Sequence, residues 1–201
     1  MSTNLTWNQA RITKSNRRAL NGHGSFVVWL TGLSGAGKST IANELEHYFY
    51  QQGQRAYVLD GDNMRFGLNS DLSFSEEDRR ENIRRVAEVA KLMVDAGVIV
   101  IAAFISPYRT DRQLARMRFE EGEFVEVHVK CALDTCIRRD PKGLYEKALA
   151  GTISNFTGIQ APYEEPTDPE LKVDTDQVAL PDSVQHIVDY LSNRGMLKCT
   201  S

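Results

Sequence analysis

The sequence of 201 residues has no long apolar run, few cysteines and no excess of positive charge. No apolar stretch reaches the roughly 18 residues that a membrane-spanning helix needs, and residues 1–24 lack the apolar centre of a secretion signal. Three cysteines, Cys131, Cys136 and Cys199, form no C-x-x-C pair, which favours free thiols in a reducing cytoplasm. A net charge of −3 argues against a general nucleic-acid binder. These absences predict a cytoplasmic globular protein that uses neither membrane nor nucleic acid.

Apolar runs rich in β-branched residues alternate with segments of helical periodicity. The apolar runs cover residues 25–31, 55–62, 98–104, 124–130 and 171–175. Helical periodicity covers residues 39–53, 75–97, 109–122, 133–151 and 181–195, with the fourth segment broken into two helices at Pro141. This alternation predicts an α/β fold: a parallel sheet of about five strands flanked by helices on both faces. A single domain, residues 25–201, follows an N-terminal arm, residues 1–24, that is either a short helix or a loose segment.

The stretch GLSGAGKST, residues 32–40, matches the phosphate-loop pattern G-x-x-x-x-G-K-[ST]. Its glycines allow a tight turn that points backbone N–H groups inward, and the following helix adds its positive end. Lys38 can reach the outer phosphates of a nucleotide, and Ser39 can ligate Mg²⁺. Because the stretch lies between a predicted strand and a predicted helix, it indicates a P-loop NTPase-like fold that binds ATP with Mg²⁺ rather than a structural glycine turn.

Two acids close the second predicted strand. Asp60 and Asp62 project from one face if the strand continues, but Gly61 permits a turn between them. Ligands of such folds gather at the carboxyl ends of the strands. One of these carboxylates can therefore bind Mg²⁺ or accept a hydroxyl proton. A surface turn rich in Asp and Gly is the alternative interpretation.

Arginines gather in the segment that follows the acids. We assign Arg80, Arg85 and Arg112 to a solvated, salt-bridged helix face. Arg65 and Arg79 are instead candidates for holding an anionic acceptor, because a guanidinium grips phosphate or sulfate through paired hydrogen bonds. Two loop aromatics, Phe74 and Phe156, either pack into the core or sandwich a base.

Five stretches together resemble the adenylylsulfate kinase family. They are GLSGAGKST, LDGDNMRFGLNSDLSFSEEDRRENIRRVAEVA, AFISPYR, RDPKGLYEKALAG and NFTGI. The resemblance runs from about residue 24 to the C-terminus and is closest to the stand-alone kinase. It implies transfer of the ATP γ-phosphoryl group to the 3′-hydroxyl of adenosine 5′-phosphosulfate, which gives 3′-phosphoadenosine 5′-phosphosulfate and ADP in sulfate assimilation. It also implies a cytoplasmic homodimer that can associate with ATP sulfurylase.

The resemblance places the family's site residues on matching positions. It implies catalytic roles for Lys38, Asp62 and Ser106, and Mg²⁺ ligation by Ser39 and Asp62. The ATP-binding residues are Gly32, Leu33, Ser34, Gly35, Ala36, Gly37, Lys38, Ser39, Thr40 and Arg138. The acceptor-binding residues are Asp62, Arg65, Phe74, Arg79, Asn82, Ile105, Ser106, Lys142, Gly143, Leu144 and Phe156. A lid spans about residues 140–160.

Two questions stay open in the sequence. Some bacterial members of the family are described with a phosphoserine at the position of Ser106, whereas direct attack on ATP needs no such intermediate. We predict direct transfer, with Ser106 as a hydrogen-bonding partner, because the fragment offers no base beside it. Another small-molecule or nucleotide kinase, or a nucleotide-binding module without catalysis, is the alternative function.

Overall fold

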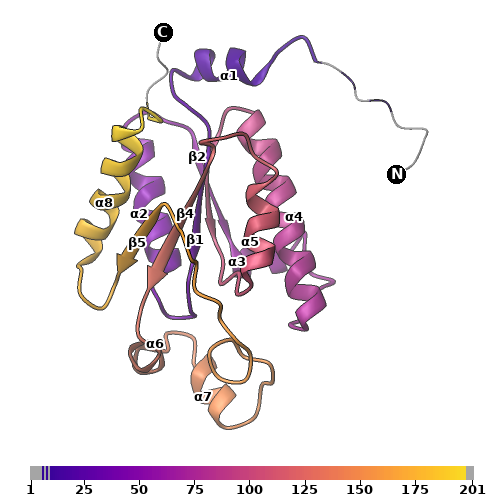
Figure 1. Ribbon diagram of the computed structural model, residues 1–201, viewed down its shortest axis with the longest axis vertical. Helices are drawn as coiled ribbons and strands as arrows, with labels where there is room; N and C mark the ends of the chain where they lie inside the picture. The colour runs from indigo at the N-terminus through magenta and orange to yellow at the C-terminus, as the bar shows by residue number, and fades with distance from the viewer. Residues whose placement is uncertain (1–5, 7, 9, 198–201) are drawn as a thin grey trace.

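The computed structural model describes residues 6, 8 and 10–197 as a five-stranded sheet with helices on both faces (Figure 1). The sheet order is β2-β3-β1-β4-β5, and every neighbouring pair is parallel. The strands are β1 (Val27–Thr31), β2 (Ala56–Asp60), β3 (Ile99–Ala103), β4 (Phe124–Lys130) and β5 (Leu171–Asp174). The predicted fold class is therefore confirmed.

The sheet separates two apolar cores, and alternating residues of β1 contribute to one core or the other. Val28 and Leu30 pack with α2 (Lys38–Gln51) and α8 (Leu180–Asn193) on one face. Val27 and Trp29 pack on the other face, against α4 (Glu76–Asp95) and α5 (Arg109–Arg116). Successive strand side chains point to opposite faces, so a continuous apolar run is the pattern of a strand covered on both sides. All five residues of β1 are buried.

Three of the shorter helices lie at the two ends of the sheet. At the carboxyl ends of the strands are α6 (Leu133–Arg139) and α7 (Leu144–Leu149), and α1 (Lys14–Asn21) lies at the opposite end (Figure 1). The N-terminal arm thus contains a short helix, which Thr13 caps. Residues 1–5, 7 and 9 of the predicted arm lie outside the described residues.

Two predicted boundaries were wrong. The second strand stops at Asp60, which caps the short helix α3 (Gly61–Arg65), so the turn at Gly61 is the correct alternative. The helix predicted over residues 109–122 stops at Arg116. Beyond it the chain turns, and the ring of Phe119 packs against Phe124 at a centroid distance of 5.5 Å. Tertiary packing of that aromatic outweighs the local helical pattern.

Two of the expected absences can be compared with the structure. Cys131 and Cys136 are buried free thiols, whereas Cys199 lies outside the described residues. Within residues 6, 8 and 10–197, every helix is too short or too polar to span a membrane.

Candidate active site

The phosphate loop joins β1 to α2 as the sequence predicts. A Cβ atom at Gly32 would lie 2.3 Å from the carbonyl oxygen of Val129, so only glycine lets the two backbones approach here. Gly37 caps α2 with φ +97°, a left-handed conformation that side chains rarely tolerate. The loop therefore presents its backbone N–H groups at the positive end of α2.

Lys38 lies buried at the start of α2. Its Nζ donates hydrogen bonds to the carbonyl oxygens of Gly32 and Leu33, at 2.8 and 2.7 Å. The pKa of Lys38 is lowered to about 8, mainly by burial and also by the charge of Lys142, although Cys136, Asp60 and Asp62 act in the opposite direction. The ammonium therefore has weak partners that polyphosphate could replace.

The two acids behave differently. Asp60 accepts the backbone N–H of Asp62 at Oδ1 (2.9 Å) and the hydroxyl of Ser39 at Oδ2 (2.8 Å). Asp62 instead forms an ion pair with Lys142. Mg²⁺ typically takes one or two protein carboxylates and completes its shell with water and substrate phosphates. The hydroxyl of Ser39 and these carboxylates fit that donor set. The resemblance implies Asp62 as the carboxylate ligand, whereas the structure places Asp60 directly against Ser39.

Arg65 and Arg79 lie at opposite ends of the loop that contains Phe74. Arg65 donates to the carbonyl oxygens of Leu72 and Ser73, at 3.0 and 2.9 Å. Its guanidinium carbon lies 4.2 Å from the centroid of the Phe74 ring. Burial lowers the pKa of both arginines, but a guanidinium stays charged at neutral pH.

Arg79 connects α4 to the predicted lid. It donates to the Asn155 carbonyl oxygen at 2.7 Å, to Thr157 Oγ1 at 3.0 Å, and to the Phe74 carbonyl oxygen at 3.0 Å. These partners are neutral oxygens rather than carboxylates. Among the described residues, no carboxylate therefore pairs with the positive charge of Arg79.

The two candidate stacking aromatics differ in burial. Phe74 is 58% exposed, whereas Phe156 is 8% exposed and packs edge-on against Tyr145 at a centroid distance of 4.9 Å. Both rings line the same cavity. Phe156 is thus both a core residue and a cavity wall, while Phe74 is largely exposed and lies against the guanidinium groups of Arg65 and Arg79.

Ser106 has an unusual backbone. Its φ is +40°, in the left-handed region, and its side chain is buried. Its Oγ accepts the indole N–H of Trp29 at 3.2 Å and lies 3.4 Å from the carbonyl oxygen of Phe104. Strain of this kind persists where surrounding contacts fix the conformation, and it is frequent at functional sites.

The lid segment, residues 140–160, is fixed at its beginning by Asp140. That carboxylate accepts the backbone N–H groups of Leu144 and Glu146, at 2.9 and 3.0 Å. These hydrogen bonds cap α7. The hydroxyl of Tyr145 then donates to the Ser34 carbonyl oxygen of the phosphate loop at 3.0 Å. The segment therefore contacts the phosphate loop directly.

Most of these groups line one cavity of about 1030 Å³. Its lining contains five cationic side chains and two carboxylates: Lys38, Arg65, Arg79, Arg139 and Lys142 against Asp60 and Asp62. This positive balance contrasts with the net charge of −3 of the whole chain. The volume is at the upper end of the about 300–1000 Å³ typical of ligand pockets. The cavity can therefore hold large anionic ligands.

Most predicted site residues line this cavity. They are Ser34, Gly35, Gly37, Lys38, Ser39, Thr40, Asp62, Arg65, Phe74, Arg79, Asn82, Ile105, Ser106, Lys142, Leu144 and Phe156. Gly32, Leu33, Ala36 and Gly143 are not among the described lining residues. The last three adjoin lining residues in the chain, and the Gly32 carbonyl oxygen accepts a hydrogen bond from the lining residue Lys38.

Arg138 is not among the described lining residues; it donates to Thr135 on its own helix. The adjacent Arg139 lines the cavity, where it donates to the Thr175 carbonyl oxygen at 2.7 Å. The sequence prediction missed both Arg139 and Thr175. The position of Thr175 immediately after β5, at the carboxyl edge of the sheet, is a signal that could have indicated it.

The prediction for the surface arginines was right for two residues and wrong for the third. Arg80 and Arg85 form ion pairs with Glu76 and Glu81 along α4. Arg112 is only 2% exposed and pairs with Glu126 of β4 at 2.7 Å. A buried carboxylate partner makes its burial possible, and the local sequence of α5 does not reveal that partner.

Comparison with known proteins agrees with this site. Residues 24–174 match the family model described as adenylylsulphate kinase. The adenylyl-sulfate kinase of Geotalea uraniireducens is 56% identical over 96% of this chain and 92% of its own length. The APS kinase of Mycobacterium tuberculosis, solved in complex with AMPPNP and APS, is 46% identical. It has a TM-score of 0.81 over 85% of this chain and 98% of that one.

A second solved structure, the hexameric APS kinase of Thiobacillus denitrificans, is 36% identical with a TM-score of 0.67. The match covers 89% of this chain and 31% of that one. Sequence identity, coverage and fold therefore agree with the phosphate loop and the positive cavity: the chain belongs to the adenylylsulfate kinase family.

Proposed function

We propose that this chain transfers the γ-phosphoryl group of ATP to the 3′-hydroxyl of adenosine 5′-phosphosulfate. The observation that carries the proposal is the single positive cavity, which joins a complete phosphate loop to a second cluster of arginines and aromatics. A nucleotide-binding module without catalysis needs only the first of these parts. Two anionic ligands in one cavity are what phosphoryl transfer between them requires.

The donor is held by the loop of residues 32–40. Backbone N–H groups and the start of α2 bind the phosphates, and Lys38 exchanges its carbonyl partners for the outer phosphates as charge develops there. Arg139 lines the cavity and donates to the Gly35 carbonyl oxygen of the phosphate loop at 3.4 Å, so it is better placed than Arg138 to contact the donor nucleotide. These residues neutralise and orient the donor.

Ser39 with Asp60 and Asp62 are the residues that would hold Mg²⁺. The metal, when bound, supplies Lewis-acid neutralisation of the phosphate charge. The ion pair between Asp62 and Lys142 opens when the acceptor enters. Asp62 can then accept the proton of the 3′-hydroxyl.

The acceptor is held by charge and by stacking. Arg65, Arg79 and Asn82 bind the phosphosulfate, and Phe74 and Phe156 stack on the adenine. The carbonyl partners of both arginines support this assignment, because an anionic ligand can replace them at little cost. Ile105, Lys142, Gly143 and Leu144 complete the acceptor side, and the lid segment excludes water that would hydrolyse ATP.

Transfer is direct in this mechanism, and Ser106 acts as a hydrogen-bonding partner. Its Oγ has the Trp29 indole and the Phe104 carbonyl oxygen as its neighbours, so no described base activates it. Burial raises the pKa of the nearby Tyr108, so that phenol stays protonated at neutral pH and cannot accept a proton from Ser106. Inversion of configuration in chirally labelled γ-phosphate is the expected result. Net retention, with phosphate trapped on Ser106 at a competent rate, would overturn direct transfer.

The test of the function is ADP release with different acceptors. Adenosine 5′-phosphosulfate should drive rapid release, whereas AMP, CMP or no acceptor should give only slow hydrolysis. Fast turnover with AMP or CMP would identify another nucleotide kinase, and no acceptor dependence would identify a binding module. The resemblance to the family also leads us to expect a homodimer, a cytoplasmic location and association with ATP sulfurylase. Sedimentation of the chain with and without a sulfurylase tests the homodimer and the association.

A further inference from the structure

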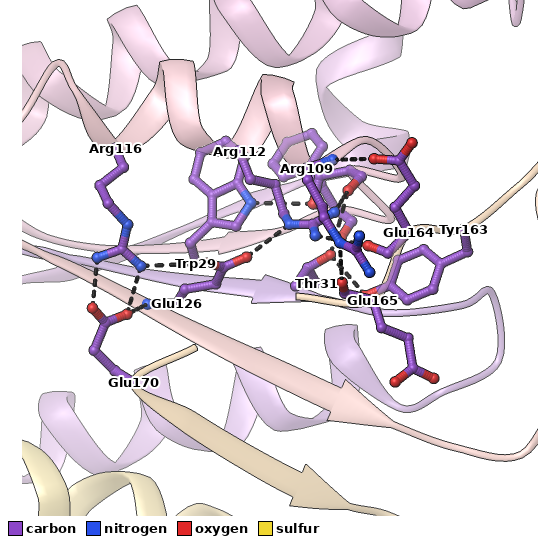
Figure 2. Close-up of polar contacts among 12 residues, drawn as sticks. Trp29, Thr31, Arg109, Arg112, Arg116, Glu126, Tyr163, Glu164, Glu165 and Glu170 are labelled. Carbon is purple, nitrogen blue, oxygen red and sulfur yellow. Dashed lines mark hydrogen bonds and ion pairs between the residues drawn. The ribbon is translucent and has the colours of Figure 1, made fainter. Parts of the chain in front are cut away.

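Arg112 lies behind the active-site cavity and contacts three separate parts of the chain (Figure 2). Its Nε donates to Glu126 Oε1 of β4, and its two terminal nitrogens donate to the carbonyl oxygens of Ser106 and Glu164. Each of these distances is 2.7 Å. Arg112 is not among the described cavity-lining residues. Its planar donors thus join β4, the turn after β3, and the segment by which the chain returns from the lid.

The turn after β3, residues 105–107, is the part of this assembly that lines the cavity. Within it Ser106 has the left-handed φ of +40°, which costs free energy in a residue other than glycine. Thr31 Oγ1 donates to the Ile105 carbonyl oxygen at 2.8 Å, and the Glu164 backbone N–H donates to the Pro107 carbonyl oxygen at 2.9 Å. Arg112 supplies the 2.7 Å bond to the remaining carbonyl, that of the strained residue itself, which Thr31 Oγ1 also approaches at 3.5 Å.

The turn lies between the two halves of the site. In the sheet, β3 runs between β2, which leads to Asp60, and β1, which leads to the phosphate loop. The returning segment is also held by α5, since Arg109 Nε donates to the Glu165 carbonyl oxygen at 2.6 Å and its backbone N–H donates to Glu164 Oε2 at 2.8 Å. Helix α5 therefore holds both the turn of residues 105–107 and the segment around Glu164 and Glu165 that follows the lid.

We infer that Arg112 is a positioning residue for the acceptor: it holds the turn of residues 105–107 and the segment returning from the lid in the geometry that binds adenosine 5′-phosphosulfate. The inference rests on the proposed function. Lysine at this position keeps the charge, but its three donors share one nitrogen and cannot reproduce contacts that the planar guanidinium makes from three separate nitrogens. None of the described hydrogen bonds of Arg112 goes to the phosphate loop, so the donor side should be unaffected.

Arg116 provides a matched control one turn further along α5. It pairs with the same Glu126 at 3.3 Å and with Glu170 at 2.5 Å (Figure 2). Its described hydrogen bonds go to Phe124, Glu126 and Glu170, so it leaves the turn and the returning segment untouched. Arg116→Lys disturbs the same ion-pair network without disturbing the turn.

The experiment measures kcat and both Michaelis constants of Arg112→Lys and Arg116→Lys, well below the melting temperature of each. We expect Arg112→Lys to raise the acceptor KM at least tenfold and to leave the ATP KM within twofold. Arg116→Lys should lower the melting temperature but keep both constants within twofold. An acceptor KM within twofold of wild type in Arg112→Lys, or an equal rise in Arg116→Lys, would overturn the inference.

A second pair of variants applies if Arg112→Lys does not fold. Glu126→Gln keeps an oxygen for Arg112 and should keep the acceptor KM, whereas Arg112→Met combined with Glu126→Gln leaves no unpaired buried charge and should raise it at least tenfold. Equal acceptor constants in these two variants would contradict the inference. Failure of the wild-type chain to use adenosine 5′-phosphosulfate would instead refute the proposed function, so the two failures are distinguishable.

Discussion

The donor side and the acceptor side of the cavity are built in different ways. The donor side is one continuous loop of nine residues whose binding groups are mostly backbone N–H groups fixed by glycine geometry. The acceptor side is assembled from segments near residues 62, 74–82, 105–107 and 142–157. Its cationic side chains bind loop carbonyls or, in Lys142, a carboxylate. A backbone site is complete once the loop folds, whereas a side-chain site depends on several tertiary contacts.

The largest expected effect is on the donor side. Lys38→Ala should lower turnover by about 10²–10³-fold, the scale of one preorganised electrostatic group. A variant that keeps more than about a tenth of the wild-type rate, which is about 1.4 kcal/mol, would remove Lys38 from its assigned role. Lys91→Ala, at an exposed position of α4, is the control and should keep wild-type activity.

On the acceptor side, Arg79→Lys should raise the acceptor KM roughly tenfold with the ATP KM unchanged. The lost contacts are hydrogen bonds from a charged group, each worth about 1.5–3 kcal/mol when its partner is left unpaired, and the ammonium recovers part of them. Arg80→Lys is the matched control, because Arg80 is exposed and pairs with Glu76 within α4. Wild-type acceptor kinetics in Arg79→Lys would show that Arg79 does not bind the acceptor.

Substitutions of the two aromatics should differ in their effects on acceptor affinity and on stability. Phe74→Ala should weaken the acceptor by about 1–3 kcal/mol, the value of stacking on one base, with little loss of stability because Phe74 is largely exposed. Phe156→Ala should also lower the free energy of unfolding by about 3–5 kcal/mol, as for a buried phenylalanine. Titration calorimetry and thermal unfolding measure the two quantities. A weakened ATP affinity with unchanged acceptor affinity would assign the rings to the donor.

The smallest expected effect is a pH dependence of ATP binding. The pKa of Lys38 is lowered to about 8 by burial, and bound phosphates raise it again because they favour the charged form. ATP binding therefore takes up protons, and its affinity should fall as pH rises through 8, by about twofold between pH 7 and pH 8. Calorimetry in buffers of different ionisation enthalpy measures this uptake. Proton release, or equal uptake in Lys38→Ala, would contradict the assignment.

The two sides also differ in how far the sequence predicts them. The apolar runs and the phosphate loop are local patterns, so the fold and the donor residues 34–40 follow from short windows. The acceptor residues were assigned by resemblance, and the structure brings Asp62, Arg65, Phe74 and Arg79 to one cavity. No local pattern brings these positions together, since tertiary packing alone decides their distances.

The missed residues have a common physical cause. Arg112 resembles any charged helix residue, and its burial depends on Glu126, in another strand. Arg139 and Arg138 are adjacent on a helix of seven residues, and only the position of α6 beside the cavity decides which of them faces inward. The strand predicted to include Asp62 ended at Asp60 because the carboxylate of Asp60 caps the next helix. Each error concerns a contact between distant or competing elements.

The contact between the lid segment and the phosphate loop has a thermodynamic consequence. The Tyr145 hydroxyl binds the Ser34 carbonyl oxygen, and the Tyr145 ring packs against Phe156 on the acceptor side. If donor and acceptor both favour one arrangement of this pair, their affinities are linked. Whatever factor a bound donor applies to the affinity for the acceptor, the acceptor must apply to the affinity for the donor. In that case one residue of the lid segment links the affinities of the two half-sites.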